Sequence, residues 1–182
     1  MKTIFNRASG FTLIEALVTI SIAAILASIA IPSFSKMIQD NRVSTASNDF
    51  LSALMLARSE AVKRSMSVSI CTSSDGATCS NTLKDYARGW IIFTDCGGDK
   101  KVTTAATTCD LDGDGTNDPD KILRVEQGLK GVFIKSTANK KAFTYQFSGR
   151  ASNTSFDIGP KGQSATRKIN VAITGRARLK KL

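Results

Sequence analysis

An apolar run near the N-terminus constrains the fold of this 182-residue chain more than any other feature. It extends over residues 11–31, where Glu15 is the only ionisable side chain. About 20 apolar residues in a helix are enough to cross a bilayer, so the run predicts a transmembrane segment over residues 11–31. A carboxylate at the centre of a bilayer costs on the order of 2.5–3.5 kcal/mol, and we therefore expect Glu15 to have a charged partner and a function.

The junction before this run has a specific pattern. It reads ASGFTLIE over residues 8–15 and follows a short basic leader. This junction resembles the class III signal of type IV pilins and pseudopilins. The resemblance implies that a prepilin peptidase removes residues 1–10 after Gly10, and that Phe11 becomes an N-methylated N-terminus. An ordinary secretory signal is the alternative, but it would have a shorter apolar core followed by a small-residue cleavage site.

Glu15 would be the fifth residue of the mature chain. In the family that the junction resembles, this glutamate pairs with the N-terminal amine of a neighbouring subunit during filament assembly. Two charges in lipid neutralise each other when the second subunit docks. A simple membrane anchor, the other interpretation of the run, would not need this carboxylate.

The hydrophobic pattern after the run predicts a long helix followed by a sheet. Pro32 should bend the helix because it removes a backbone donor. Apolar residues then recur at helical spacing, so we expect one helix over residues 11–65 whose second half packs on a sheet. From residue 66 the period changes to two, which predicts an antiparallel β-rich globular domain over residues 66–182 and an α+β fold. The predicted strands are 68–70, 89–93, 122–125, 132–134, 143–147 and 169–173.

Several segments narrow the resemblance. They are LARSEAV at 56–62, GWIIF at 89–93, an Asp/Gly-rich turn before 122–124, and FSGR at 147–150. Together they resemble the FimT and FimU minor pilins and the GspH pseudopilins, without separating pilus members from secretion members. The resemblance implies a pilin-like subunit with one pass through the bacterial inner membrane and its domain in the periplasm. It also implies assembly with other pilins into a filament, near the tip.

The four cysteines contain no Cys-x-x-Cys pair, and the chain has no histidine, which argues against a zinc site. An exported chain with an even number of cysteines favours disulfides. Three pairings are possible, and we favour the pairing of neighbours, Cys71 with Cys79 and Cys96 with Cys109.

Catalysis is not expected, because the chain has no histidine for acid–base chemistry and no phosphate-binding glycine loop. An acidic stretch at 110–118 resembles a calcium loop. However, Lys121 stands where an EF-hand has its bidentate glutamate, and Asp, Asn and Gly are also good turn residues. We therefore favour a turn and no cofactor, with calcium as the alternative. The calcium ligands would be Asp110, Asp112, Asp114 and Asp118.

Positive charge is concentrated in the last third of the chain. Residues 121–182 contain 14 Lys and Arg against two acidic residues, whereas residues 1–120 contain 11 against 13. Such asymmetry indicates a polyanionic partner, either nucleic acid or an anionic surface. If the C-terminus is extended, Arg176, Arg178 and Lys180 project from one face and can contact successive phosphates.

Gly-Arg-x-Arg at 175–178 also resembles the C-terminal DNA-binding motif of the FimT minor pilins. The resemblance implies that this chain binds DNA for uptake in natural transformation. The candidate contacts are Arg176, Arg178, Lys180, Lys181, Arg167 and Lys168. A solvated basic tail or an edge strand protected by charge are structural alternatives. The functional alternatives are a pseudopilin of type II secretion and a purely structural tip-priming pilin.

Overall fold

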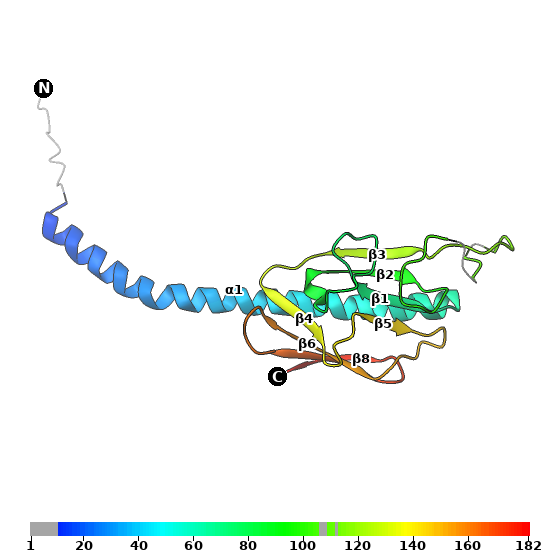
Figure 1. Cartoon of the computed structure of the whole chain (residues 1–182). Helices are drawn as coiled ribbons and strands as arrows, with labels where there is room; N and C mark the ends of the chain where they lie inside the picture. Colours follow the sequence, from blue (N-terminus) through cyan, green and yellow to red (C-terminus); the bar gives the residue numbers. More distant parts are fainter. Residues whose placement is uncertain (1–10, 106–108, 112) are drawn as a thin grey trace, which may run out of the picture. The chain divides into compact units, whose positions relative to one another are not determined.

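The computed structural model describes residues 11–105, 109–111 and 113–182 (Figure 1). The chain divides into two compact units. The first unit is Met1–Ile38 and the second is Gln39–Leu182. The predicted leader, residues 1–10, lies outside the described residues, and so does its cleavage residue Gly10.

Helix α1, Leu13–Arg64, begins in the first unit and includes Pro32. Thr12 caps its N-terminus, because the Thr12 hydroxyl accepts a hydrogen bond from the Glu15 N–H at 3.3 Å. The helix is long and apolar enough to cross a membrane by length and composition, with a mean hydropathy of 2.3 over its most apolar 18 residues. Most side chains of residues 11–38 are exposed in the isolated chain, as expected of a segment that lipid or neighbouring helices would cover.

The second half of α1 supplies the helical layer of the second unit. Its buried face repeats at helical spacing, as the sequence pattern predicts. The buried residues of this face are Val43, Ala46, Ser47, Phe50, Ala53, Leu54, Ala57 and Ala61.

Two antiparallel four-stranded sheets complete the second unit. The first sheet has the order β3-β2-β1-β5, and a short 3₁₀ helix η1, Tyr86–Arg88, precedes β2. Its strands are β1 Val68–Thr72, β2 Gly89–Thr94, β3 Ile122–Gln127 and β5 Ala142–Tyr145. The second sheet has the order β4-β6-β7-β8. Its strands are β4 Val132–Ser136, β6 Thr154–Pro160, β7 Arg167–Val171 and β8 Ala177–Lys181.

Phe50 joins the three layers of the core. Its ring centroid lies 5.4 Å from that of Trp90 on β2 and 4.9 Å from that of Phe156 on β6, both in edge-to-face geometry. Tyr86 of η1 completes the cluster at 5.2 Å from Phe50. Such aromatic pairs add about 0.5–1.5 kcal/mol each beyond the burial of their area. The helix therefore packs against both sheets at once, and the predicted α+β pilin-like fold is confirmed.

Three details of the strand prediction are corrected. The strands form two sheets rather than one, and β6 lies in a segment for which the sequence analysis predicted no strand. Two of the predicted strands extend too far, to Phe147 and Ile173. Both residues lie in turns beyond the ends of β5 and β7, and their side chains are 64% and 57% exposed. Each continued an apparent alternation past the residue at which the strand pairing ends.

Candidate nucleic-acid interface

The alternation along β7 and β8 decides which basic residues share a surface. Ile169 and Val171 of β7 are fully buried, so Lys168 and Asn170, which alternate with them, point to the opposite, outer face of the sheet. Lys168 pairs with Lys180 of β8, and Asn170 pairs with Arg178. Because directly opposed residues lie on one face, these four side chains share the outer face of the second sheet.

Arg176 precedes β8 and is exposed, two residues before Arg178. With the two-residue period it continues the row formed by Arg178 and Lys180. The expected row of three basic side chains is therefore present. The same geometry places Arg167 and Lys181 opposite each other and on the other face, the side of Leu179, which packs against the core. The structure thus separates these two candidate contacts from the other four.

The outer face continues onto β6 and β4. Asp157 of β6 forms an ion pair with Lys168, whose Nζ lies 3.2 Å from the Asp157 Oδ1. Lys135 of β4 is the strand partner directly opposite Asp157. One acidic side chain is therefore surrounded by lysines, and the face keeps an excess of positive charge. We call the set Lys135, Lys168, Arg176, Arg178 and Lys180 the outer basic face; Lys168 is half-buried and the other four are exposed.

A cleft of about 450 Å³ lies at one end of this face. Arg176 and Arg178 line it together with Asn170, whose side-chain oxygen accepts a hydrogen bond from the Ser155 hydroxyl at 2.8 Å. The remaining lining residues are Asn153, Ala172 and Thr174.

Arg58 of α1 contacts the turn between β7 and β8, which directly precedes Arg176 and Arg178. Its Nε donates to the Gly149 carbonyl at 3.1 Å, and its Nη2 donates to the Thr174 carbonyl at 3.0 Å. Gly175 has φ +76°, and a Cβ there would collide with the Gly149 carbonyl oxygen. The sequence analysis singled out the segments that contain Arg58 and Gly149 without assigning them a contact. An arginine bordering an otherwise apolar helical stripe was the available signal.

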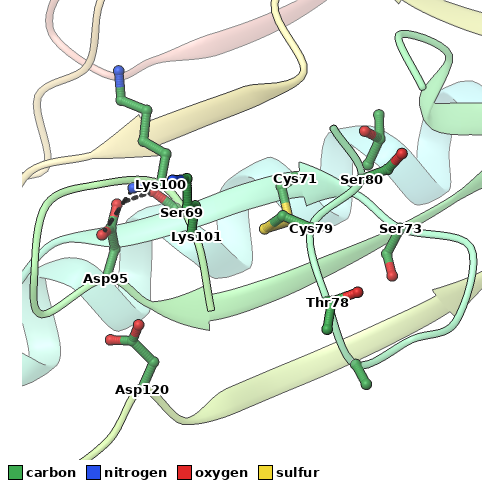
Figure 2. Close-up of a disulfide and its surroundings, with 12 residues drawn as sticks. Ser69, Cys71, Ser73, Thr78, Cys79, Ser80, Asp95, Lys100, Lys101 and Asp120 are labelled. Carbon is green, nitrogen blue, oxygen red and sulfur yellow. Dashed lines mark hydrogen bonds between the residues drawn. A yellow bond between two sulfur atoms is a disulfide. The ribbon is translucent and has the colours of Figure 1, made fainter. Parts of the chain in front are cut away.

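The structure pairs Cys71 with Cys79 and Cys96 with Cys109, which is the pairing of neighbours that the sequence favoured. The first disulfide connects β1 to the loop that follows it (Figure 2).

Asp75 lies inside the loop that the Cys71–Cys79 disulfide closes. Its carboxylate accepts hydrogen bonds from the Thr78 hydroxyl and from the N–H groups of Thr78 and Ala77. These bonds, the one from the Thr78 hydroxyl most of all, hold the pKa of the Asp75 carboxyl below its usual range.

Asp95 lies directly before the second disulfide and is buried. Its carboxylate accepts from the Ser69 hydroxyl at 2.6 Å and from the Lys100 N–H at 3.2 Å (Figure 2). Burial raises the pKa of Asp95, although the Ser69 hydrogen bond acts in the opposite direction.

The acidic loop is built from hydrogen bonds within itself. Asp110 accepts from the Gly113 and Gly115 N–H groups, and Asp114 accepts from Thr116. Asp118 accepts from the Leu111 N–H, while Asp112 lies outside the described residues. Within the part of the chain that the structure describes, no group of three acidic, Cys or His residues is arranged to hold a metal.

The residues of the predicted processing and assembly site lie at the start of α1. Phe11 is exposed and precedes the helix, and Glu15 is exposed in its first turn. Among the ion pairs between described residues, none involves Glu15. The helix N-terminus favours a carboxylate at this position.

Comparisons with known proteins agree with this architecture. The model of the GspH family, described as type II transport protein GspH, matches residues 46–175, and the prokaryotic N-terminal methylation motif matches residues 5–31. A search of curated proteins found no match.

Two solved structures illustrate the structural likeness. One is the type IV minor pilin FimU of Pseudomonas aeruginosa, at 21% identity over 78% of this chain and 90% of that one, with a TM-score of 0.53. Another is the minor pseudopilin EpsH of the Vibrio cholerae type 2 secretion system, at 14% identity over 77% of this chain and 97% of that one, with a TM-score of 0.46. The family model spans most of the chain, and the methylation motif covers the apolar run. The chain therefore belongs to the GspH family and is a type IV pilin-like minor pilin or pseudopilin.

Proposed function

We propose that this chain is a minor type IV pilin, incorporated near the tip of a pilus, that binds DNA for uptake in natural transformation. The observation that carries the proposal is the row of Arg176, Arg178 and Lys180 on the outer face of the second sheet. Arginine recognises phosphate through two parallel hydrogen bonds, and a row of cations on a strand can follow a phosphate backbone.

The proposal predicts a particular dependence on salt. With about four phosphates neutralised, the logarithm of the binding constant should fall with the logarithm of salt concentration at a slope of roughly −3 to −4. Phe133 lies beside this face, with its ring centroid 5.6 Å from the Lys135 ammonium, but no aromatic side chain lines the cleft at the two arginines, so contact with the backbone is favoured there over base stacking. Binding should therefore depend little on DNA sequence.

The first experiment measures the affinity of the full chain, in neutral detergent micelles, for a fluorescein-labelled DNA duplex by fluorescence anisotropy over a salt titration. Arg176→Gln with Arg178→Gln should abolish binding at moderate salt. No binding by the wild-type chain at low salt would overturn the proposal.

A matched control follows from the pairing of β7 and β8. Lys180→Gln and Lys181→Gln each remove one positive charge from adjacent, exposed residues, but Lys180 lies on the outer face and Lys181 on the other. Lys180→Gln should weaken binding and reduce the salt slope by about one. Lys181→Gln should change both much less. Equal effects would show that net charge, and not the outer face, attracts the DNA.

We further infer that prepilin peptidase cleaves after Gly10, that Phe11 is N-methylated, and that the domain is periplasmic before assembly. The methylation motif supports the processing, and the exposed Glu15 on an apolar helix supports its pairing with the N-terminal amine of a neighbouring subunit. Mass spectrometry of the mature N-terminus tests the processing. An N-terminus elsewhere, or an unmodified Phe11, would contradict it.

The second candidate function is that of a minor pseudopilin in type II secretion. The description of the matching family model favours it. A deletion strain separates the two functions, because loss of a secreted substrate with normal transformation would support the pseudopilin. Loss of transformation with normal secretion would support the DNA-binding pilin.

A further inference from the structure

We propose that the cleft beside Arg176 and Arg178 binds one backbone phosphate, and that Asn170 donates its amide N–H groups to it. This inference rests on the DNA-binding function proposed above, and it adds an uncharged phosphate contact to the basic row. Asn170 was not among the candidate contacts from the sequence.

The hydrogen bonds around the cleft determine what Asn170 offers to a ligand. The side-chain oxygen of Asn170 accepts from the Ser155 hydroxyl at 2.8 Å, so its NH₂ group is the part that remains for a ligand. Asn170 stands directly opposite Arg178 across the β7–β8 pair, which places its amide beside a guanidinium group. A guanidinium has donors only.

The walls of the cleft are correspondingly rich in donors. The carbonyl of Thr174, which could otherwise attract a donor, already accepts from Arg58 at 3.0 Å. The lining residues include no carboxylate and no aromatic ring. A cleft of this kind favours an anion with several acceptor oxygens over a base edge or an apolar group.

The arrangement of the donors favours a phosphate over a carboxylate. Arg176 and Arg178 are two residues apart, or about 6.8 Å along an antiparallel strand, and Asn170 reaches the cleft from the neighbouring strand. A tetrahedral phosphate can accept from donors that converge from different backbone positions, whereas a planar carboxylate is satisfied by one bidentate arginine. An acidic surface of another pilin subunit would therefore use the arginines without Asn170.

The backbone beside the cleft and the Asn170 amide are held in place before any ligand arrives. Arg58 fixes both the Gly149 carbonyl and the Thr174 carbonyl, and the Ser155 hydroxyl fixes Asn170. Ordered donors lose less conformational entropy on binding, which raises affinity without adding a contact.

The test compares an uncharged contact with charged ones in the same anisotropy titration of the full chain with labelled duplex DNA. Asn170→Leu should weaken binding roughly tenfold at every salt concentration, because a hydrogen bond to a charged group is lost. Its salt slope should equal that of the wild type, because no charge changes. Arg178→Gln should both weaken binding and reduce the slope by about one.

Two further variants guard against trivial effects. Asn170→Asp keeps the size of the side chain but places a carboxylate beside Arg178, so it should weaken binding more than Asn170→Leu. Asn48→Leu makes the same change at another exposed asparagine, on α1, and should leave binding unchanged. Inorganic phosphate should also compete with DNA for the wild type more strongly than acetate at equal ionic strength.

The outcomes separate the two proposals. If the arginine variants lose binding while Asn170→Leu binds as the wild type does, the cleft proposal is wrong and the DNA-binding function stands. Equal competition by phosphate and acetate would also contradict a phosphate-specific cleft. A wild-type chain that does not bind DNA overturns the proposed function, and this inference with it.

Discussion

Arg58 shows how one side chain can join segments that are far apart in the sequence. It contacts the carbonyls of Gly149 and Thr174, which are 91 and 116 residues away. The sequence draws attention to the segment at 56–62 that contains Arg58, but a helical period of 3.6 cannot reveal a contact with a distant turn. The same limit applies to Asn170, because an isolated asparagine in a strand carries no recognisable signal.

The Asp75 loop gives a prediction at the scale of one carboxyl group. Hydrogen bonds hold the pKa of Asp75 low in the folded chain, so the group adds stability above the ordinary aspartate pKa of about 3.9. This contribution is lost as the pH falls from there through the folded-state pKa. Thr78→Val removes the largest cause, the hydroxyl that donates at 2.6 Å, and should raise the pKa of Asp75 towards its ordinary value.

An NMR titration of the Asp75 carboxyl carbon measures this change. Thr116→Val is the matched control, because the Thr116 hydroxyl donates to Asp114 at the same distance of 2.6 Å. It should leave the titration of Asp75 unchanged. An Asp75 that titrates in the wild type as an ordinary aspartate would refute the proposed role of these hydrogen bonds.

Among the secondary-structure elements, those with a regular apolar period could be predicted. The helix and strands β1 to β5 and β7 follow from their local apolar patterns, and the structure confirms them, although β5 and β7 end earlier than predicted. Strand β6 was missed because it contains Asp157, Gly159 and Pro160, which are uncommon in strands. It forms because β4 and β7 pair with its two sides and because Phe156 and Ile158 enter the core. Pairing of this kind depends on distant strands, so a local pattern does not show it.

The turn between β7 and β8 gives a prediction at the scale of an element. Gly175 and Gly162 both have positive φ, +76° and +81°, and an alanine at either position should cost about 1–2 kcal/mol for its backbone conformation. A Cβ at Gly175 also collides with the Gly149 carbonyl, whereas at Gly162 it meets open space. Gly175→Ala should therefore lower the free energy of unfolding by clearly more than Gly162→Ala.

Urea unfolding of the two variants, followed by tryptophan fluorescence, measures the difference. Trp90 is fully buried in the core and reports loss of packing. Equal losses would mean that the turn moves away from Gly149 at little cost. The hydrogen bonds from Arg58 would then not fix the position of the turn that precedes β8.

At the scale of the whole molecule, the second unit contains its entire described core. The first buried residue is Val43, and the helix and both sheets contribute to one aromatic cluster. We therefore predict that a chain beginning at Gln39 folds on its own and unfolds cooperatively, at a midpoint close to that of the full chain in detergent. Thermal unfolding followed by near-ultraviolet circular dichroism measures this. A truncated chain without a cooperative transition would contradict the prediction.

Strand β8 is the last strand in its sheet, so one of its sides has no partner strand in the described chain. An edge of this kind is a template for pairing with another chain, and lysine side chains are a common protection against it. The positive charges along β8 would therefore serve both the proposed contact with an anion and resistance to aggregation. Selection for either role would conserve the same positions, and variants that neutralise them should be examined for solubility as well as for affinity.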